Sequence, residues 1–219
     1  MKAVVRLLCA LLSVIAFSFF SDLARAQVTA TAPVPENAQY LNRWDVYGGA
    51  QYSHFNPGPG RNVAANNLLG WTGAATVYFR PVWGIEASVR GLYGTMTIPP
   101  NPYNVVTNPK MNETLFLFGP TFRLWRRPAY NIGLHVLIGA AYGSFDRDFP
   151  AGIQPNLVGV YNNKLAFGSA VGGSYDYNLS PRLAVRLFTD WQATRYGYTV
   201  QNEFAGSVGI VYKFGSLQK

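Results

Sequence analysis

The amino-acid sequence predicts an all-β protein, an eight-stranded antiparallel up-and-down transmembrane β-barrel that follows a cleaved signal peptide. Three observations predict this fold class. Apolar and polar residues alternate over eight segments, the links between segments are alternately short and long, and aromatic residues gather at the segment ends on the apolar face. Of the 219 residues, 13% are charged and 15% are aromatic, a composition too apolar for a disordered chain.

The start of the chain predicts a secretory signal peptide. Lys2 and Arg6 form a basic beginning, Leu7–Phe20 is an apolar run of 14 residues, and Ala24-Arg25-Ala26 is a small-x-small cleavage site. The apolar run is shorter than the ~20 residues that a membrane-spanning helix needs. The chain therefore divides into a signal peptide, a flexible N-terminal segment and the barrel, at residues 1–26, 27–43 and 44–219.

Cleavage after Ala26 changes the chemistry of the exported chain. It removes Cys9, the one cysteine of the sequence, so no disulfide or thiol chemistry is expected. It also lowers the formal net charge from +8 to +6, because three basic residues and one acidic residue leave with the signal. A positive surface on an exported protein suits anionic lipid head groups better than nucleic acid, which we do not expect as a partner.

Eight segments of the exported chain alternate with a period of two residues, as strands do. Each is long enough for the ~9–11 residues with which a tilted strand crosses a bilayer. No second apolar stretch of 18 residues occurs, so no membrane-spanning helix is expected. The segments lie at about 45–55, 69–80, 84–97, 112–125, 131–145, 164–177, 182–196 and 202–214.

The links between the segments are sorted by length. Short turns follow the second, fourth and sixth segments, at 80–83, 126–130 and 178–181. Long links follow the first, third and fifth segments, at 56–67, 99–111 and 146–163. Short turns at one end and long loops at the other are typical of outer-membrane barrels.

The apolar face is predicted to point outward. In the seventh segment Leu187 and Trp191 share one face, whereas Arg186 and Asp190 share the other. Alternation alone does not say which face is inside, but two rings of aromatic residues on the apolar face are typical of the two interfaces of a membrane. The predicted rings are Phe79, Phe122, Tyr177, Tyr212 and Phe214 at one level, and Trp71, Tyr93, Tyr142 and Trp191 at the other.

The charged face would then line the lumen. An eight-stranded barrel has an interior just wide enough for side chains to fill. Interspersed acids and bases therefore favour a plug of paired charges over a gate or a proton-linked site, which stays the alternative. We predict a lumen charge network formed by Glu86, Arg90, Glu113, Arg123, Asp176, Arg186, Asp190 and Glu203, in which Glu86, Arg90, Arg186, Asp190 and Glu203 pair across the barrel.

The last segment carries the sharpest motif. Ser207, Gly209, Tyr212 and Phe214 follow the pattern polar, any, Gly, two of any kind, aromatic, any, aromatic. This pattern resembles the assembly signal of the small eight-stranded outer-membrane barrels, the OmpA/OmpX-like superfamily with its outer membrane protein beta-barrel domain. The resemblance spans residues 44–214. It departs from the family at the end, where five residues follow the last aromatic, and no room is seen for a peptidoglycan-binding domain.

The resemblance implies that the protein lies in the outer membrane of a Gram-negative type of cell. It implies outer-membrane lipids, lipopolysaccharide and the barrel-assembly machinery as partners. It also implies a range of roles, among them envelope support, adhesion, resistance and small-solute leakage, between which the fold does not choose. The long link 146–163 is the candidate to bind a ligand, whose nature the sequence does not reveal.

A lipid-modifying enzyme is the main rival class. Nucleophilic catalysis needs Ser and His within hydrogen-bond reach. His54 adjoins Ser53, but neighbours on a strand point to opposite faces, and His135 has Gly133 and Leu137 at the same-face positions. We therefore expect no enzyme, no catalytic residue, no metal site and no cofactor. A small-solute pore is the remaining alternative.

Overall fold

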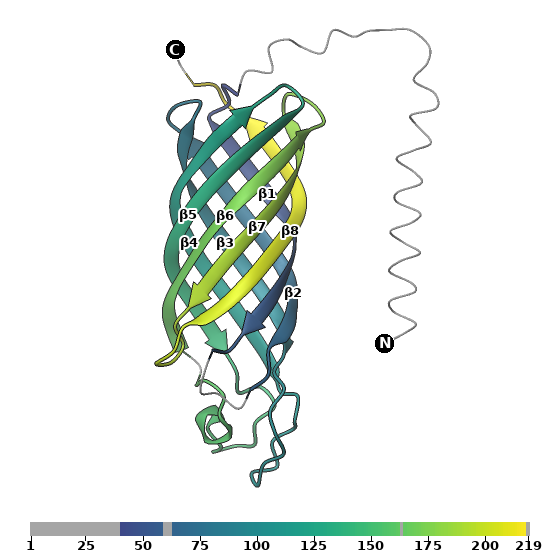
Figure 1. Cartoon of the computed structure of the whole chain (residues 1–219), viewed down its shortest axis with the longest axis vertical. Coiled ribbons are helices and arrows are strands. Elements are labelled where there is room, and N and C mark those ends of the chain that lie inside the picture. The colour runs from purple at the N-terminus through teal and green to yellow at the C-terminus, as the bar shows by residue number, and fades with distance from the viewer. Residues whose placement is uncertain (1–39, 59–62, 163, 218–219) are drawn as a thin grey trace, which may run out of the picture. The chain divides into compact units, whose positions relative to one another are not determined.

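The structure is a computed structural model that describes residues 40–58, 63–162 and 164–217. Within these ranges eight strands form one closed barrel, in which every neighbouring pair is antiparallel and β8 returns to β1 (Figure 1). The predicted eight-stranded up-and-down barrel is confirmed, and each strand end lies within three residues of its predicted position. The strands are β1 (Trp44–Asn56), β2 (Asn66–Tyr78), β3 (Trp83–Thr95), β4 (Lys110–Arg126), β5 (Tyr130–Ser144), β6 (Lys164–Asn178), β7 (Leu183–Thr194) and β8 (Gln201–Phe214).

The segment before the barrel is described only from Tyr40 onward. The predicted signal peptide, residues 1–26, and residues 27–39 of the predicted flexible segment lie outside the described residues. Among the described residues the one helical element is η1 (Pro155–Val158), and no helix is long and apolar enough to cross a membrane.

Strand β8 shows why these sequences form a barrel with an apolar outside. Phe204, Val208 and Tyr212 are exposed, whereas Glu203 and Lys213 are buried. Because successive side chains of a strand point to opposite faces, one face of β8 is apolar and the charges lie within. Large exposed apolar side chains occur on all eight strands. Such a continuous surface suits lipid, since water-soluble proteins rarely expose apolar patches of this extent.

The nine residues of the two predicted aromatic rings are all exposed. Near the short turns Phe214 stacks on Trp44 and on Tyr212, with ring centroids 6.4 and 5.8 Å apart. Toward the long loops the Trp71 indole donates a hydrogen bond of 3.4 Å to the Tyr93 hydroxyl. Aromatic rings at the two edges of an apolar band of about 25 Å mark the membrane interfaces of outer-membrane barrels.

The two ends of the barrel differ in the way that the link lengths predicted. Short turns join β2 to β3, β4 to β5 and β6 to β7 at the end where β1 starts and β8 stops (Figure 1). The long links lie at the opposite end, where they pair with one another. Ile98 N donates to Thr107 O at 2.8 Å, which extends the β3–β4 hairpin, and a bridge from Ala64 to Thr97 joins the β1–β2 link to it.

The closing seam between β8 and β1 supplies a test of this packing. A Cβ added at Gly209 would collide with the backbone of Gly48 and Gly49, whereas a Cβ at Gly206 would meet only the Phe188 carbonyl oxygen, 3.8 Å away. We expect Gly209→Ala to lower the free energy of unfolding by about 1–3 kcal/mol through overpacking. Gly206→Ala on the same strand should be nearly neutral. Urea unfolding of the refolded protein in detergent micelles measures both, and equal effects would contradict the close approach of β1 to Gly209.

Candidate functional site

Charged side chains fill the lumen in two clusters. The lower cluster, nearer the short turns, consists of Asp45, Arg123, Asp176, Arg186 and Lys213, each at most 3% exposed. Arg186 binds Asp176 with both Nε and Nη2, at 2.6 and 2.9 Å, and Nη2 also donates to Asp45 at 3.1 Å. Arg123 Nη2 donates to both oxygens of Asp45, at 3.1 and 3.2 Å, and Lys213 Nζ lies 3.5 Å from Asp176. These contacts compensate charges that would be costly to bury alone.

Tyrosine rings enclose the lower cluster. The Arg123 guanidinium lies 3.4 Å above the centroid of the Tyr78 ring, a cation–π contact. Tyr40 closes the short-turn end, where its hydroxyl donates to the carbonyl oxygen of Arg127 at 2.7 Å and accepts from Asn178 Nδ2 at 2.6 Å. Burial raises the pKa of the Tyr40 phenol above its usual value, so the hydroxyl keeps its proton and remains a donor.

The upper cluster lies on the side of the long loops and consists of Glu86, Arg90, His135, Asp190, Gln192 and Glu203. Arg90 Nη1 is 2.6 Å from Asp190 Oδ2. His135 bridges two acids, with Nε2 2.9 Å from Asp190 and Nδ1 3.2 Å from Glu86. Gln192 accepts a hydrogen bond from Arg90 and donates one of 3.3 Å to Glu203.

An apolar layer separates the two clusters. Tyr47 and Phe188 meet edge to face with centroids 5.0 Å apart, and Ala74, Ala184 and Val211 pack around them. Among the described residues no hydrogen bond or ion pair joins the clusters. Four of the five residues predicted to pair in one network, Glu86, Arg90, Asp190 and Glu203, do lie together, but the prediction is wrong for Arg186, which lies in the lower cluster. The reason lies on β7, where Phe188 occupies the inward position between Arg186 and Asp190.

Glu113 does not pair with a base, contrary to its predicted role in the network. Its Oε1 accepts a hydrogen bond of 2.6 Å from the Tyr196 hydroxyl. Burial, and then the nearby Glu113 carboxyl, raise the pKa of the Tyr196 phenol, so Tyr196 stays neutral and remains the donor. Because Tyr196 follows β7, this bond ties the β7–β8 loop to the inside of the barrel.

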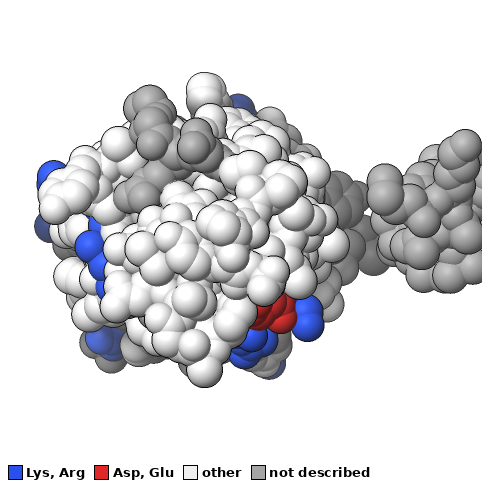
Figure 2. Space-filling view, turned by 90° about the horizontal axis from the view of Figure 1, so that it is seen from below, with Lys and Arg blue, Asp and Glu red and all other residues white. Residues whose placement is uncertain are grey.

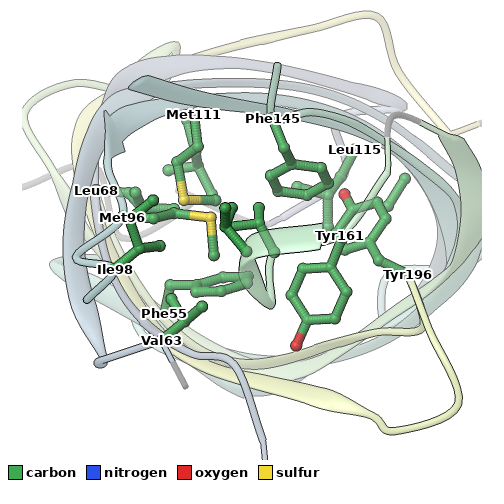
Figure 3. Close-up of a cluster of buried hydrophobic side chains, with 14 of the residues drawn as sticks. Phe55, Val63, Leu68, Met96, Ile98, Met111, Leu115, Phe145, Tyr161 and Tyr196 are labelled. Carbon is green, nitrogen blue, oxygen red and sulfur yellow. The ribbon is translucent and has the colours of Figure 1, made fainter. Parts of the chain in front are cut away.

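Above the upper cluster the lumen is apolar (Figure 3). Inward side chains of the strands meet side chains that the long loops fold into the barrel, and we call this cluster the apolar cap. Within it the Phe145 ring lies 5.6 Å from the Tyr161 ring and 5.2 Å from the Tyr196 ring. The strands contribute Phe55, Leu68, Leu92, Met111, Leu115, Leu117, Leu137, Ala141 and Ala170, and the loops contribute Val63, Met96, Ile98, Val105, Phe145, Val158, Val160, Tyr161 and Tyr196.

The cap also shapes the outer surface of the loops. Burial of a large apolar side chain stabilises a fold by about 1.5–3 kcal/mol, so the buried loop residues hold the loops against the barrel. Seen from the loop end, the surface is mostly uncharged, with basic side chains and one acidic patch toward its edge (Figure 2). Exposed apolar side chains on these loops are Tyr103, Val106, Leu157, Tyr198 and Val200.

Comparison with known proteins supports the fold alone. No family model and no curated protein sequence matches the chain. The crystal structure of the outer membrane protein OprG from Pseudomonas aeruginosa is similar with a TM-score of 0.56 and 12% identity, over 80% of this chain and 97% of that one. The crystal structure of Neisserial surface protein A is similar with a TM-score of 0.52 and 13% identity, over 78% of this chain and 97% of that one.

A third similar structure is that of Ail, the attachment invasion locus protein of Yersinia pestis, with a TM-score of 0.51 and 16% identity over 79% of this chain and 99% of that one. This chain has the fold of the small eight-stranded outer-membrane β-barrels. The resemblance drawn from the last strand is thus confirmed at the level of fold. That Ser207, Gly209, Tyr212 and Phe214 of this barrel act as an assembly signal stays a prediction.

The barrel holds two groups that the sequence analysis did not find. Asp45 is the acid that joins Arg123 to Arg186, yet it stands second in β1 beside Trp44, where the alternation is only beginning. The apolar cap was not predicted, because a single leucine at a polar-face position interrupts the alternation without indicating that it contacts other apolar side chains. The signal available was Leu92, an apolar residue at a polar-face position of its segment.

Loss of one base from the lower cluster tests its charge pairing. Arg186→Ala would leave Asp176 and Asp45 without their main partner in the barrel interior. We expect the free energy of unfolding to fall by about 3–5 kcal/mol. Arg182→Ala, an exposed arginine of the preceding turn, is the matched control and should change stability by less than about 0.5 kcal/mol. Denaturant titration of the refolded proteins checks the difference, and a small effect of Arg186→Ala would show that water already solvates the acids.

Proposed function

We propose that the protein is a non-enzymatic barrel of the Gram-negative outer membrane with a closed lumen, and that it supports the envelope or binds surface ligands through its long loops. The observation that carries this proposal is the filling of the lumen. The lower cluster, the apolar layer of Tyr47 and Phe188, the upper cluster and the apolar cap occupy it in series. Their side chains are almost completely buried. The filling argues against the alternative of a small-solute pore.

The histidines support the absence of hydrolytic chemistry. His135 has a carboxylate on each ring nitrogen, Asp190 and Glu86, and therefore no nitrogen to activate a serine. His54 is exposed on the outside of β1, and its Nδ1 lies 2.8 Å from Asn67 Oδ1. Its neighbour Ser53 points inward and donates to Glu203. Neither histidine has the serine partner that a lipid hydrolase of this fold requires.

The loops support a role at the cell surface. The apolar cap packs buried loop side chains against the barrel, so we expect a ligand to meet a largely preformed surface. That surface is largely uncharged and carries exposed Tyr103 and Tyr198. The similar structures include one named as an attachment protein and one named as a surface protein, although identities of 16% and 13% carry no ligand over to this chain.

Single-channel recording tests the closed lumen. The parent protein, purified from outer-membrane fractions and reconstituted into planar bilayers, should show no steady current. Arg186→Ala alone should also stay closed, because the upper cluster and the apolar cap remain in series with the altered site. A variant that combines Arg90→Ala, Arg186→Ala and Phe188→Ala with removal of loop residues 147–160 removes side chains from all four layers and should conduct.

Two results would contradict the proposal. A large, steady current through the parent would favour the pore. Recovery of the parent as a soluble periplasmic protein, without the heat-dependent gel mobility of a folded membrane barrel, would remove the outer-membrane location. The gel shift also serves as the control that each variant is folded.

A further inference from the structure

The short-turn end of the barrel carries five exposed arginines, which we call the arginine rim: Arg43, Arg80, Arg126, Arg127 and Arg182. Each short turn supplies or adjoins at least one of them, and Arg43 precedes β1. Backbone hydrogen bonds fix two of them at this end of the wall. Tyr78 N donates to Arg43 O at 2.8 Å, and Lys213 N donates to Arg182 O at 2.7 Å.

The charge of the rim is unbalanced. Among the described residues none of its five guanidinium groups has a hydrogen bond or ion pair, and no exposed acid lies at that end of the barrel. The arginines of the lumen, by contrast, all have carboxylate partners. At the loop end the exposed bases Lys110, Arg147, Lys164 and Arg195 share the surface with Asp146 and Asp148, and the backbone N–H of Lys110 donates to Asp148. Among the described residues the positive charge is thus concentrated at the rim, which has five bases and no exposed acid, whereas the loop end has four bases and two acids.

The rim stands at the level of a membrane interface. Trp44 and Phe214 stack on the outer wall beside Arg43. The rings of Phe79 and Trp83 lie beside Arg80, with their centroids 5.0 Å apart. Aromatic residues of this kind lie at the depth of lipid head groups. Arginines next to them extend their guanidinium groups into the head-group layer while their stems cover apolar surface.

A groove of about 580 Å³ opens at the rim between the segment before β1, the β6–β7 turn and the end of β8. Its lining combines the basic residues Arg182 and Lys213, the aromatic residues Tyr212 and Phe214, and the polar residues Asn42 and Ser216. A guanidinium binds a phosphate through two parallel hydrogen bonds. An apolar aromatic wall beside it suits the glycerol and first methylenes of an acyl chain.

We propose that the arginine rim binds the phosphate head groups of anionic phospholipids, with the groove at Arg182 as the most enclosed position. The inference rests on the proposed outer-membrane location, because the short-turn end of such barrels faces the periplasm and therefore the phospholipid leaflet. Every feature of the rim fits this one ligand class: unpaired guanidinium groups, interfacial depth and a groove with one charged and one apolar wall.

Two triple variants that remove equal charge test the proposal. The rim variant carries Arg80→Gln, Arg127→Gln and Arg182→Gln, one substitution at each short turn. The loop-end control carries Lys110→Gln, Lys164→Gln and Arg195→Gln, all exposed at the opposite end. The full barrel is placed in nanodiscs of phosphatidylcholine with increasing phosphatidylglycerol, and the lipids that stay bound on transfer to detergent are counted by native mass spectrometry.

The parent and the loop-end control should retain phosphatidylglycerol in preference to phosphatidylcholine, and the rim variant should lose that preference by at least about tenfold. Each basic residue near an anionic surface contributes about 1 kcal/mol, or roughly fivefold. Equal losses in both variants would show attraction by net charge alone, and an unchanged rim variant would show that the rim does not bind lipid. Displacement of the lipid by millimolar inorganic phosphate would reveal a site for soluble anions. Each of these three results overturns the proposal without affecting the outer-membrane location, which fractionation measures separately.

Discussion

The backbone of a lipid-exposed strand has no water with which to form hydrogen bonds, so every amide in the wall must pair with a neighbouring strand. Closure between β1 and β8 meets this requirement, and the rest of the structure follows from it. With the sheet closed, the side chains divide into one set that meets lipid and one set confined to a narrow lumen. Charges can be placed only in the lumen or at the two ends, where they must pair or reach water and head groups.

This constraint explains how the lumen is filled. Arg186 and Asp176 form a bidentate pair, and His135 bridges Asp190 and Glu86, because each charge buried without a partner would destabilise the barrel. Toward the long loops the protein uses apolar side chains instead. The apolar cap fills this end of the lumen with side chains from the strands and from the loops, so the packing of the lumen and the packing of the loops depend on the same cluster.

Much of the fold could be predicted from the sequence, because a period of two and the lengths of the links are local properties of the chain. The outward position of Trp71 and Trp191 and the inward position of Arg186 and Asp190 follow from the same period. Which charges meet across the lumen could not be predicted, since that depends on the tilt and stagger of the strands. The spacing on β7 predicted that Arg186 and Asp190 belong to one network, but Phe188 lies between them and separates the two clusters. Asp45 was not predicted to face the lumen, because it stands where the alternation of β1 begins.

The central claim is that the wall is apolar toward lipid and the charges are inside, and tryptophan quenching tests it directly. The five tryptophans, at positions 44, 71, 83, 125 and 191, are all exposed on the outer wall. In vesicles whose acyl chains carry bromine, their fluorescence should be strongly quenched, while aqueous iodide should have little effect. Quenching by iodide without quenching by brominated lipid would contradict the account, because the tryptophan face would then meet water and the barrel would have the opposite face inside.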